Sequence, residues 1–244
     1  NCSTIVNGFV SDKVDLIMAN ATPALTAAVS ATKDIPILGT SITAYGVALD
    51  LADFDGTVGG NVSGTSDLAD LSAQAAMITE WFPETKKVGL LFCSAEPNSR
   101  YQIEEVAKYL ADKGIESKEF AFTDTNDVTA VTQAAADYAD VIYIPTDNTA
   151  AANTEAIANV LIPAKVPAIC GEEGICSGCG VATLSISYYD LGVTTGKMAA
   201  KILTGEADIS TMAIEYTNAT KKYNAATCDA LGIKPLDGYT AIGE

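Results

Sequence analysis

Apolar and polar positions follow two regular patterns along the chain. Short apolar runs rich in β-branched residues are typical of parallel strands buried on both faces. Segments with apolar positions three or four residues apart predict helices between them. The predicted strands cover 14–19, 35–39, 88–93, 141–144, 168–170 and 182–186, and the predicted helices cover 24–32, 68–81, 101–113, 128–138, 153–162 and 191–203. Strand and helix alternate throughout, which predicts an α/β fold of doubly wound sheets.

The chain length predicts two Rossmann-like lobes with a ligand cleft between them. Its 244 residues exceed the roughly 100 to 150 residues that are typical of one core. Segment 55–66 is rich in glycine and small polar residues, and we interpret it as the first connection between lobes. We interpret 186–189 as the second. The N-terminal lobe is thus expected to comprise 1–61 and 187–244, and the C-terminal lobe 62–186, with about four strands.

The first lobe begins unlike an ordinary doubly wound lobe. A helical pattern over 2–10 precedes the first predicted strand, whereas such lobes ordinarily begin with a strand. We therefore expect that the first lobe lacks an N-terminal β-α-β unit.

Composition and charge narrow the function classes. Apolar residues make up 48% of the chain and charged residues 18%, as in compact globular proteins. The net charge is −17 and the 14 basic residues are scattered, so we expect no nucleic-acid partner. No apolar run reaches the length of a membrane span. Histidine is absent, which removes the commonest general base and zinc ligand, and we expect neither a metal nor a cofactor.

Polar residues cluster where the predicted strands end. Parallel α/β sheets bind ligands at the carboxyl ends of their strands, where helices begin. Hydroxyls and amides there suit a carboxylate and acidic side chains suit an ammonium group, so we expect a small zwitterionic solute. The candidate ligand-binding residues are Thr22, Thr43, Tyr45, Ser94, Glu96, Asn98, Ser99, Asp147, Asn148, Glu172 and Tyr188.

Helix capping is the structural alternative for several candidates. Thr22 fits an N-cap with Pro23 in the first helical position. Ser99 and Gln102 have the spacing of a capping box ahead of a helix from Arg100, and Asp147 also fits an N-cap. For these residues the spacing leaves both interpretations open.

Three cysteines lie close together in the sequence. Cys176 and Cys179 form a single C-x-x-C pair with Cys170 nearby. A zinc site would need further ligands, so a disulfide and unreactive thiols are the better alternatives, and the sequence leaves both open.

Five ordered segments resemble a known family. DKVDLIMANATPAL, DIPILGTSIT, KKVGLLFCSAEPNS, ADVIYIPTDNT and CGEEG resemble bacterial ABC-transporter substrate-binding proteins of the tryptophan-binding-lipoprotein type. The resemblance implies a periplasmic-binding-protein fold of type I and a monomeric, non-enzymatic protein outside the cytoplasm, lipid-anchored in its full-length precursor. It also implies an amino acid as the solute, aromatic in some members, captured between two closing lobes and delivered to an ABC permease.

The sequence departs from this family at one candidate loop. Ala44-Tyr45 stands where many relatives carry an aspartate and a proline. The identity of the ligand therefore does not follow from the resemblance.

Two other classes compete with solute binding. A cofactor-independent amino-acid racemase would use one cysteine from each half, and Cys93 and Cys170 both end predicted strands. Their acidic neighbours Glu96, Glu172 and Glu173 disfavour the thiolate that such an enzyme needs. The effector domain of a transcription repressor shares the fold, but the acidic charge and the lack of a helix-turn-helix pattern disfavour it.

Overall fold

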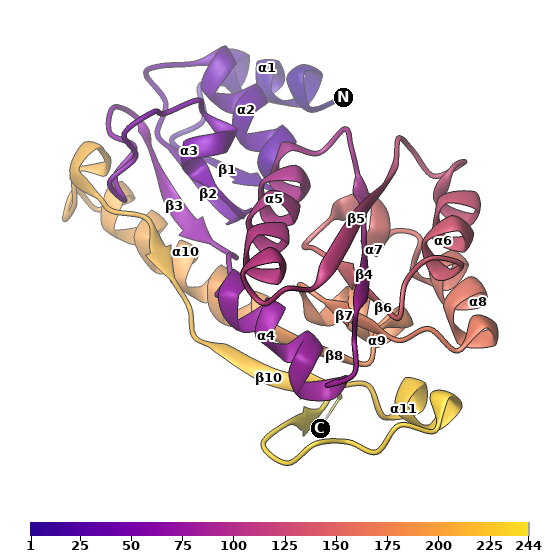
Figure 1. Ribbon diagram of the computed structural model, residues 1–244. Coiled ribbons are helices and arrows are strands. Elements are labelled where there is room, and N and C mark those ends of the chain that lie inside the picture. The colour runs from indigo at the N-terminus through magenta and orange to yellow at the C-terminus, as the bar shows by residue number, and fades with distance from the viewer. Residues whose placement is uncertain (244) are drawn as a thin grey trace. The chain divides into compact units, whose positions relative to one another are not determined.

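The computed structural model describes residues 1–243, which form two compact units. Unit 1 comprises Asn1–Leu68 and Ile186–Asn218, and unit 2 comprises Ala69–Ser185 and the chain from Ala219 onward. Both are α/β units with mainly parallel sheets (Figure 1), which confirms the predicted fold class.

Unit 1 is built on a four-stranded sheet with cores on both faces. Its order is β1-β2-β3-β9, and every neighbouring pair is parallel. Adjacent residues of β2 serve opposite faces: Ile37 packs on one side and Leu38 on the other. The elements are α1 (Cys2–Asp12), β1 (Ile17–Asn20), α2 (Thr22–Ala31), β2 (Ile37–Ile42), α3 (Tyr45–Ala48), β3 (Val62–Ser66), α10 (Tyr188–Leu203), η1 (Ile209–Thr211) and β9 (Glu215–Tyr216).

Strand β3 lies inside the segment that we interpreted as a connection between lobes, so that interpretation is wrong for 62–66. All five residues of the strand are buried although most are small or polar. Their hydroxyls have partners, because Ser63 donates to the Met212 carbonyl at 3.0 Å and Thr65 Oγ1 lies 2.8 Å from Thr195 Oγ1 of α10. Hydrogen bonding therefore makes burial possible where apolar side chains are missing.

Unit 2 is built on a seven-stranded sheet. Its strand order is β11-β10-β8-β7-β6-β4-β5. The sheet therefore has more strands than the four or so that the sequence predicts for this lobe. Helices α6 and α8 pack side by side on one face, together with α9, and α4 and α5 contact each other and the sheet (Figure 1). The elements are α4 (Leu71–Trp81), β4 (Lys87–Cys93), α5 (Pro97–Asp112), β5 (Glu116–Phe122), α6 (Val128–Ala136), β6 (Val141–Ile144), α7 (Asn148–Ala151), α8 (Thr154–Ala164), β7 (Ala168–Cys170), α9 (Glu173–Cys179), β8 (Ala182–Ile186), β10 (Ala219–Tyr223), α11 (Ala225–Leu231) and β11 (Thr240–Ala241).

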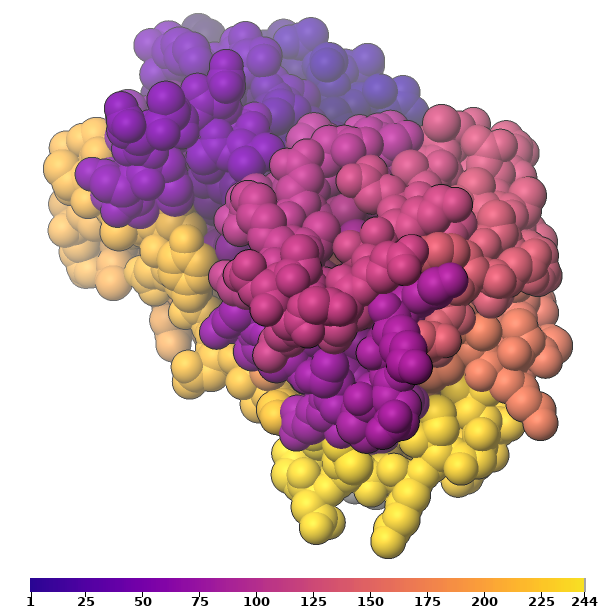
Figure 2. Space-filling model, viewed as in Figure 1, coloured from indigo at the N-terminus to yellow at the C-terminus, as the bar shows by residue number. Residues whose placement is uncertain are grey.

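The C-terminal segment belongs to unit 2, whereas the sequence placed it in the first lobe. Strands β10 and β11 extend the seven-stranded sheet. Lys221 forms an ion pair with Glu80 of α4 at 2.8 Å, and the Tyr239 ring meets the Trp81 ring edge-on at 5.0 Å. In the space-filling view the yellow C-terminal segment accordingly lies against the surface of α4 (Figure 2). The short polar strands carry no apolar pattern that indicates a sheet.

Close packing in unit 1 depends on two glycines. A Cβ atom at Gly64 would lie 2.1 Å from the Gly39 carbonyl oxygen and 2.3 Å from Tyr45 Oη. Gly64 also has φ of +148°, which side chains rarely adopt. The Tyr45 ring thus fills space that the missing side chains leave, and its hydroxyl donates to the Thr65 carbonyl.

We expect Gly64→Ala to lower the free energy of unfolding by roughly 3 kcal/mol or more, because the added methyl group clashes with backbone. Denaturant unfolding measures the change. The matched control is Gly196→Ala on the exposed side of α10, where a Cβ meets nothing within 4 Å and a small stabilisation is expected. Equal effects of the two changes would contradict this packing.

Candidate functional site

In unit 2, Glu96 holds the start of helix α7. Its Oε2 accepts from the Asn148 backbone and side-chain amides at 2.9 and 2.8 Å, and its Oε1 accepts from the Thr149 backbone amide and hydroxyl at 2.9 and 2.8 Å. Burial acts to raise the pKa of Glu96, but these four hydrogen bonds outweigh it and hold the pKa below its usual range. Glu96 is therefore an ionised carboxylate whose two oxygens are both occupied.

Asp147 completes the same helix start. Its Oδ1 accepts from the Ala150 amide at 2.8 Å as the N-cap of α7, which confirms the capping interpretation. Its Oδ2 accepts from the Cys93 amide at 2.7 Å and so joins the ends of β6 and β4. Burial and the nearby charge of Glu96 raise the pKa of Asp147, against which the hydrogen bonds act. Both oxygens have protein partners.

A buried amide network lies beneath this loop. Gln102 Nε2 donates to the Thr146 carbonyl, and its Oε1 accepts from the Thr146 amide, each at 3.0 Å. Asn98 Nδ2 donates to the same carbonyl at 3.2 Å. The predicted capping box is wrong, because α5 already begins at Pro97 and its N-cap is Glu96, so Ser99 is a helical residue. Gln102 Nε2 also donates to the Asn98 carbonyl at 3.0 Å. Ser99 is fully buried and accepts from Asn98 Nδ2 at 3.3 Å.

Two candidates of unit 2 lie at the surface. Ser94 is exposed, and its hydroxyl donates to the Phe122 carbonyl at 3.2 Å. Asn148 is exposed, with its side-chain amide held by Glu96. These two side chains lie at the edge of the sheet where the loops were expected to bind the solute.

Glu172, which follows β7, caps helix α9. Its carboxylate accepts from the Gly174 amide at 2.6 Å and from the Ile175 amide. The neighbouring Glu173 pairs instead with Lys222 of β10 at 2.5 Å. Three carboxylates of unit 2 at strand ends, Glu96, Asp147 and Glu172, thus serve helix starts.

In unit 1 the polar group at the strand ends is centred on Asp67, which the sequence analysis missed. Asp67 directly follows β3, the residue is 5% exposed, and its Oδ2 accepts from the Tyr188 hydroxyl at 3.2 Å. Its Oδ1 has no hydrogen-bond partner. Burial raises the pKa of Asp67, while hydrogen bonds from Thr43 and Tyr188 act in the opposite direction. Two predicted residues, Thr43 and Tyr188, therefore lie at this carboxylate.

The remaining candidates of unit 1 have other surroundings. Tyr45 is buried in the core, which indicates a packing role. Thr22 is the first residue of α2 and not its N-cap, so that prediction is wrong by one position. The N-cap is Ala21, whose φ of 70° and ψ of 158° are strained for a residue with a side chain. The loop that follows β1 is thus a strained segment at the same edge of the sheet as Asp67.

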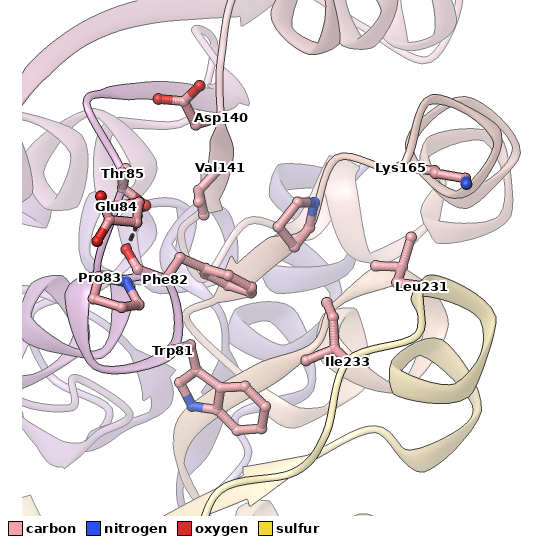
Figure 3. A pocket seen from close by; sticks show the side chains of 11 residues that line it. Trp81, Phe82, Pro83, Glu84, Thr85, Asp140, Val141, Lys165, Leu231 and Ile233 are labelled. Carbon is pink, nitrogen blue, oxygen red and sulfur yellow. Dashed lines mark hydrogen bonds between the residues drawn. The ribbon is translucent and has the colours of Figure 1, made fainter.

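A pocket of about 490 Å³ lies at the opposite edge of the unit 2 sheet (Figure 3). Asp140 and Pro167, which line it, immediately precede β6 and β7, so it opens at the amino ends of the strands. Trp81, Phe82 and Ile233 supply its apolar wall, and Asp140, Glu84 and Lys165 carry charge around it. None of the predicted ligand residues lines this pocket.

The cysteine positions contradict the racemase alternative. Cys93 and Cys170 end β4 and β7 of one sheet in unit 2, whereas a racemase would need one cysteine from each half. Burial and hydrogen bonds with Cys176 and Cys179 raise the pKa of Cys170, which disfavours a thiolate. All six cysteines are free thiols. Within residues 1–243, no three cysteine, aspartate or glutamate side chains are arranged to hold a metal ion.

Parallel sheets with helices on both faces and polar loops at their carboxyl edges define the class as α/β binding proteins of the type I periplasmic-binding-protein fold. The chain belongs to the ABC transporter substrate binding protein family, whose model matches residues 1–236. This confirms the resemblance seen in the sequence. Proteins of this family bind substrates outside the cytoplasm and are not enzymes.

Three similar proteins illustrate the relationship. A tyrosine-binding protein of Clostridioides difficile (strain R20291) is 33% identical over 235 residues, which are 96% of this chain and 67% of that protein. An ABC domain from Streptococcus pneumonia in complex with L-Trp has a TM-score of 0.91 at 29% identity, covering 99% and 85% of the two chains. A ligand-free, open substrate-binding protein with adhesive properties from Clostridium difficile has a TM-score of 0.74 at 32% identity, covering 99% and 82%.

More distant structures share the fold alone. They include a glucose-galactose-binding protein from Geobacillus stearothermophilus at 15% identity and a transcription regulator from Lactococcus lactis at 12%. In the part of the chain that the structure describes, none of the helices has the length and apolarity needed to cross a bilayer.

The hydrogen bonds of Glu96 generate a pH prediction. Because its folded pKa is lowered, its stabilisation is present above the ordinary glutamate pKa of 4.5 and is lost as the pH falls through the folded pKa. We expect Glu96→Gln to cost about 2 kcal/mol at neutral pH and to reduce the loss of stability in acid. Urea unfolding at several pH values measures both. An unchanged acid dependence would contradict the ionised state of Glu96.

Proposed function

We propose that this protein captures an aromatic amino acid, L-tryptophan or L-tyrosine, and delivers it to an ABC permease. The observation that carries the proposal is the 33% identity to a tyrosine-binding protein over 96% of the chain. The similar structure from Streptococcus pneumonia in complex with L-Trp supports the same ligand class.

The polar loops at the strand ends support a zwitterionic solute. In unit 2, the exposed Asn148 side-chain amide gives one N–H to Glu96 and has a second N–H that suits a carboxylate. In unit 1, Asp67 is a group that suits a cation. The net charge of −17 gives no general attraction for anions, which agrees with a ligand that has no net charge. Capture between two closing lobes, a monomeric state and a lipid anchor stay predictions.

Ligand-dependent thermal unfolding tests this function. We expect L-tryptophan or L-tyrosine at 100 times its dissociation constant to stabilise the protein by about 2.7 kcal/mol, because a ligand that binds only the folded state adds RT ln(1 + [L]/Kd). L-Leucine and D-galactose serve as controls, and calorimetric titration gives the affinities. Stabilisation by the sugar with none by the aromatic amino acids would contradict the proposal.

A further inference from the structure

The buried carboxylates at the carboxyl edges of the two sheets differ in how their oxygens are used. Glu96, Asp147 and Glu172 give both oxygens to backbone or side-chain donors of the protein. Asp67 gives one oxygen to Tyr188, while its Oδ1 is fully buried and has no hydrogen-bond partner. Of these four residues, Asp67 alone has an acceptor to spare.

An unsatisfied carboxylate oxygen is costly to bury. Removing an ionised carboxylate from water without a partner costs several kcal/mol, so proteins rarely retain such a group without a reason. Asn98 Oδ1 is also buried without a partner, but it carries no charge. Within residues 1–243, several side chains have a buried polar atom without a hydrogen-bond partner, and among these side chains only that of Asp67 can carry a charge.

The surroundings of Asp67 hold the carboxylate in place. Its backbone amide donates to the Ile42 carbonyl at 3.3 Å, and Ser66 Oγ donates to the Thr43 carbonyl at 3.1 Å. The ends of β2 and β3 are thus tied together on either side of the carboxylate. The Tyr188 hydroxyl orients Oδ2, while Oδ1 is buried without a donor. A group held in this way is preorganised for a ligand.

We propose that Asp67 is the residue that receives the ammonium group of the solute and selects amino acids over the corresponding acids without nitrogen. The inference rests on the proposed function, since it names the side chain that recognises one end of the zwitterion. An ammonium group supplies both the positive charge and the N–H donor that Oδ1 lacks. The raised pKa of Asp67 agrees with a carboxylate that lacks a cation in the unliganded protein.

Two probes that differ only in the ammonium group test Asp67. L-Tryptophan and indole-3-propionate share the ring and the carboxylate, and calorimetric titration gives the dissociation constant of each. We expect the unchanged protein to prefer L-tryptophan by about 30-fold or more, as is typical of a buried charge pair. In Asp67→Asn this preference should fall to about threefold or less, because affinity for L-tryptophan is lost and affinity for the acid is kept.

The matched control is Asp70→Asn, three residues further along. Asp70 caps α4 with its carboxylate oxygen bound by the Ser72 amide at 2.9 Å and the Ala73 amide at 3.1 Å. This substitution removes the same charge from an occupied carboxylate, so the 30-fold preference should remain. Equal loss of preference in both variants would indicate a general effect of charge and contradict the assignment.

Stability separates a binding role from a structural one. An oxygen without a partner contributes nothing to folding, so Asp67→Asn should unfold at the same temperature as the unchanged protein or higher. A variant that does not fold, or that weakens both probes equally, would overturn the proposal. A preference that survives in Asp67→Asn would overturn the role of Asp67 while leaving the proposed function intact. Absence of binding to L-tryptophan and L-tyrosine in the unchanged protein would reject the proposed function itself.

Discussion

Buried carboxylate oxygens need donors, and this requirement organises the loops at the strand ends. In unit 2 the short helices α7 and α9 begin where β6 and β7 end, and their first amides have no partner within the helix. Glu96, Asp147 and Glu172 supply those partners. The loops are therefore held by three carboxylates that the sequence pattern predicts as ligand-binding groups.

The same requirement explains why one carboxylate stands apart. In unit 1 no helix start uses Asp67, which has hydrogen bonds from the Tyr188 hydroxyl and from Thr43 while its Oδ1 has no partner. The protein thus fixes the position of the group while leaving one oxygen unsatisfied, which is the arrangement expected where a ligand completes the hydrogen bonds. Satisfied carboxylates build the scaffold, and the unsatisfied one is suited to recognition.

Much of the fold could be predicted from apolar periodicity, because the strongest strands are the most buried. Strands β4, β6, β7 and β8 were found within one residue of their observed bounds. Strand β5 was missed, because Glu116, Lys118 and Glu119 give this edge strand a charged face. Strand β3 was missed because its buried hydroxyls form hydrogen bonds with Met212 and Thr195, which lie 149 and 130 positions further along the chain. Local patterns do not contain such pairings.

The candidate site was predicted less completely for the same reason. The sequence places acidic residues at strand ends, but whether an oxygen is occupied depends on residues that are distant in the chain, as with Glu96 and Thr149. Asp67 was overlooked because it follows a glycine-rich stretch that resembles a linker. Capping at Asp147 was recognisable, since an N-cap is a local feature.

A crystal structure of the protein with bound L-tryptophan is the most direct measurement of this division of roles. We expect the ammonium nitrogen within about 2.7–3.2 Å of Asp67 Oδ1, with the bonds from Glu96, Asp147 and Glu172 to their helices unchanged. An ammonium nitrogen bound by one of those three carboxylates, with Asp67 Oδ1 still unpaired, would contradict it.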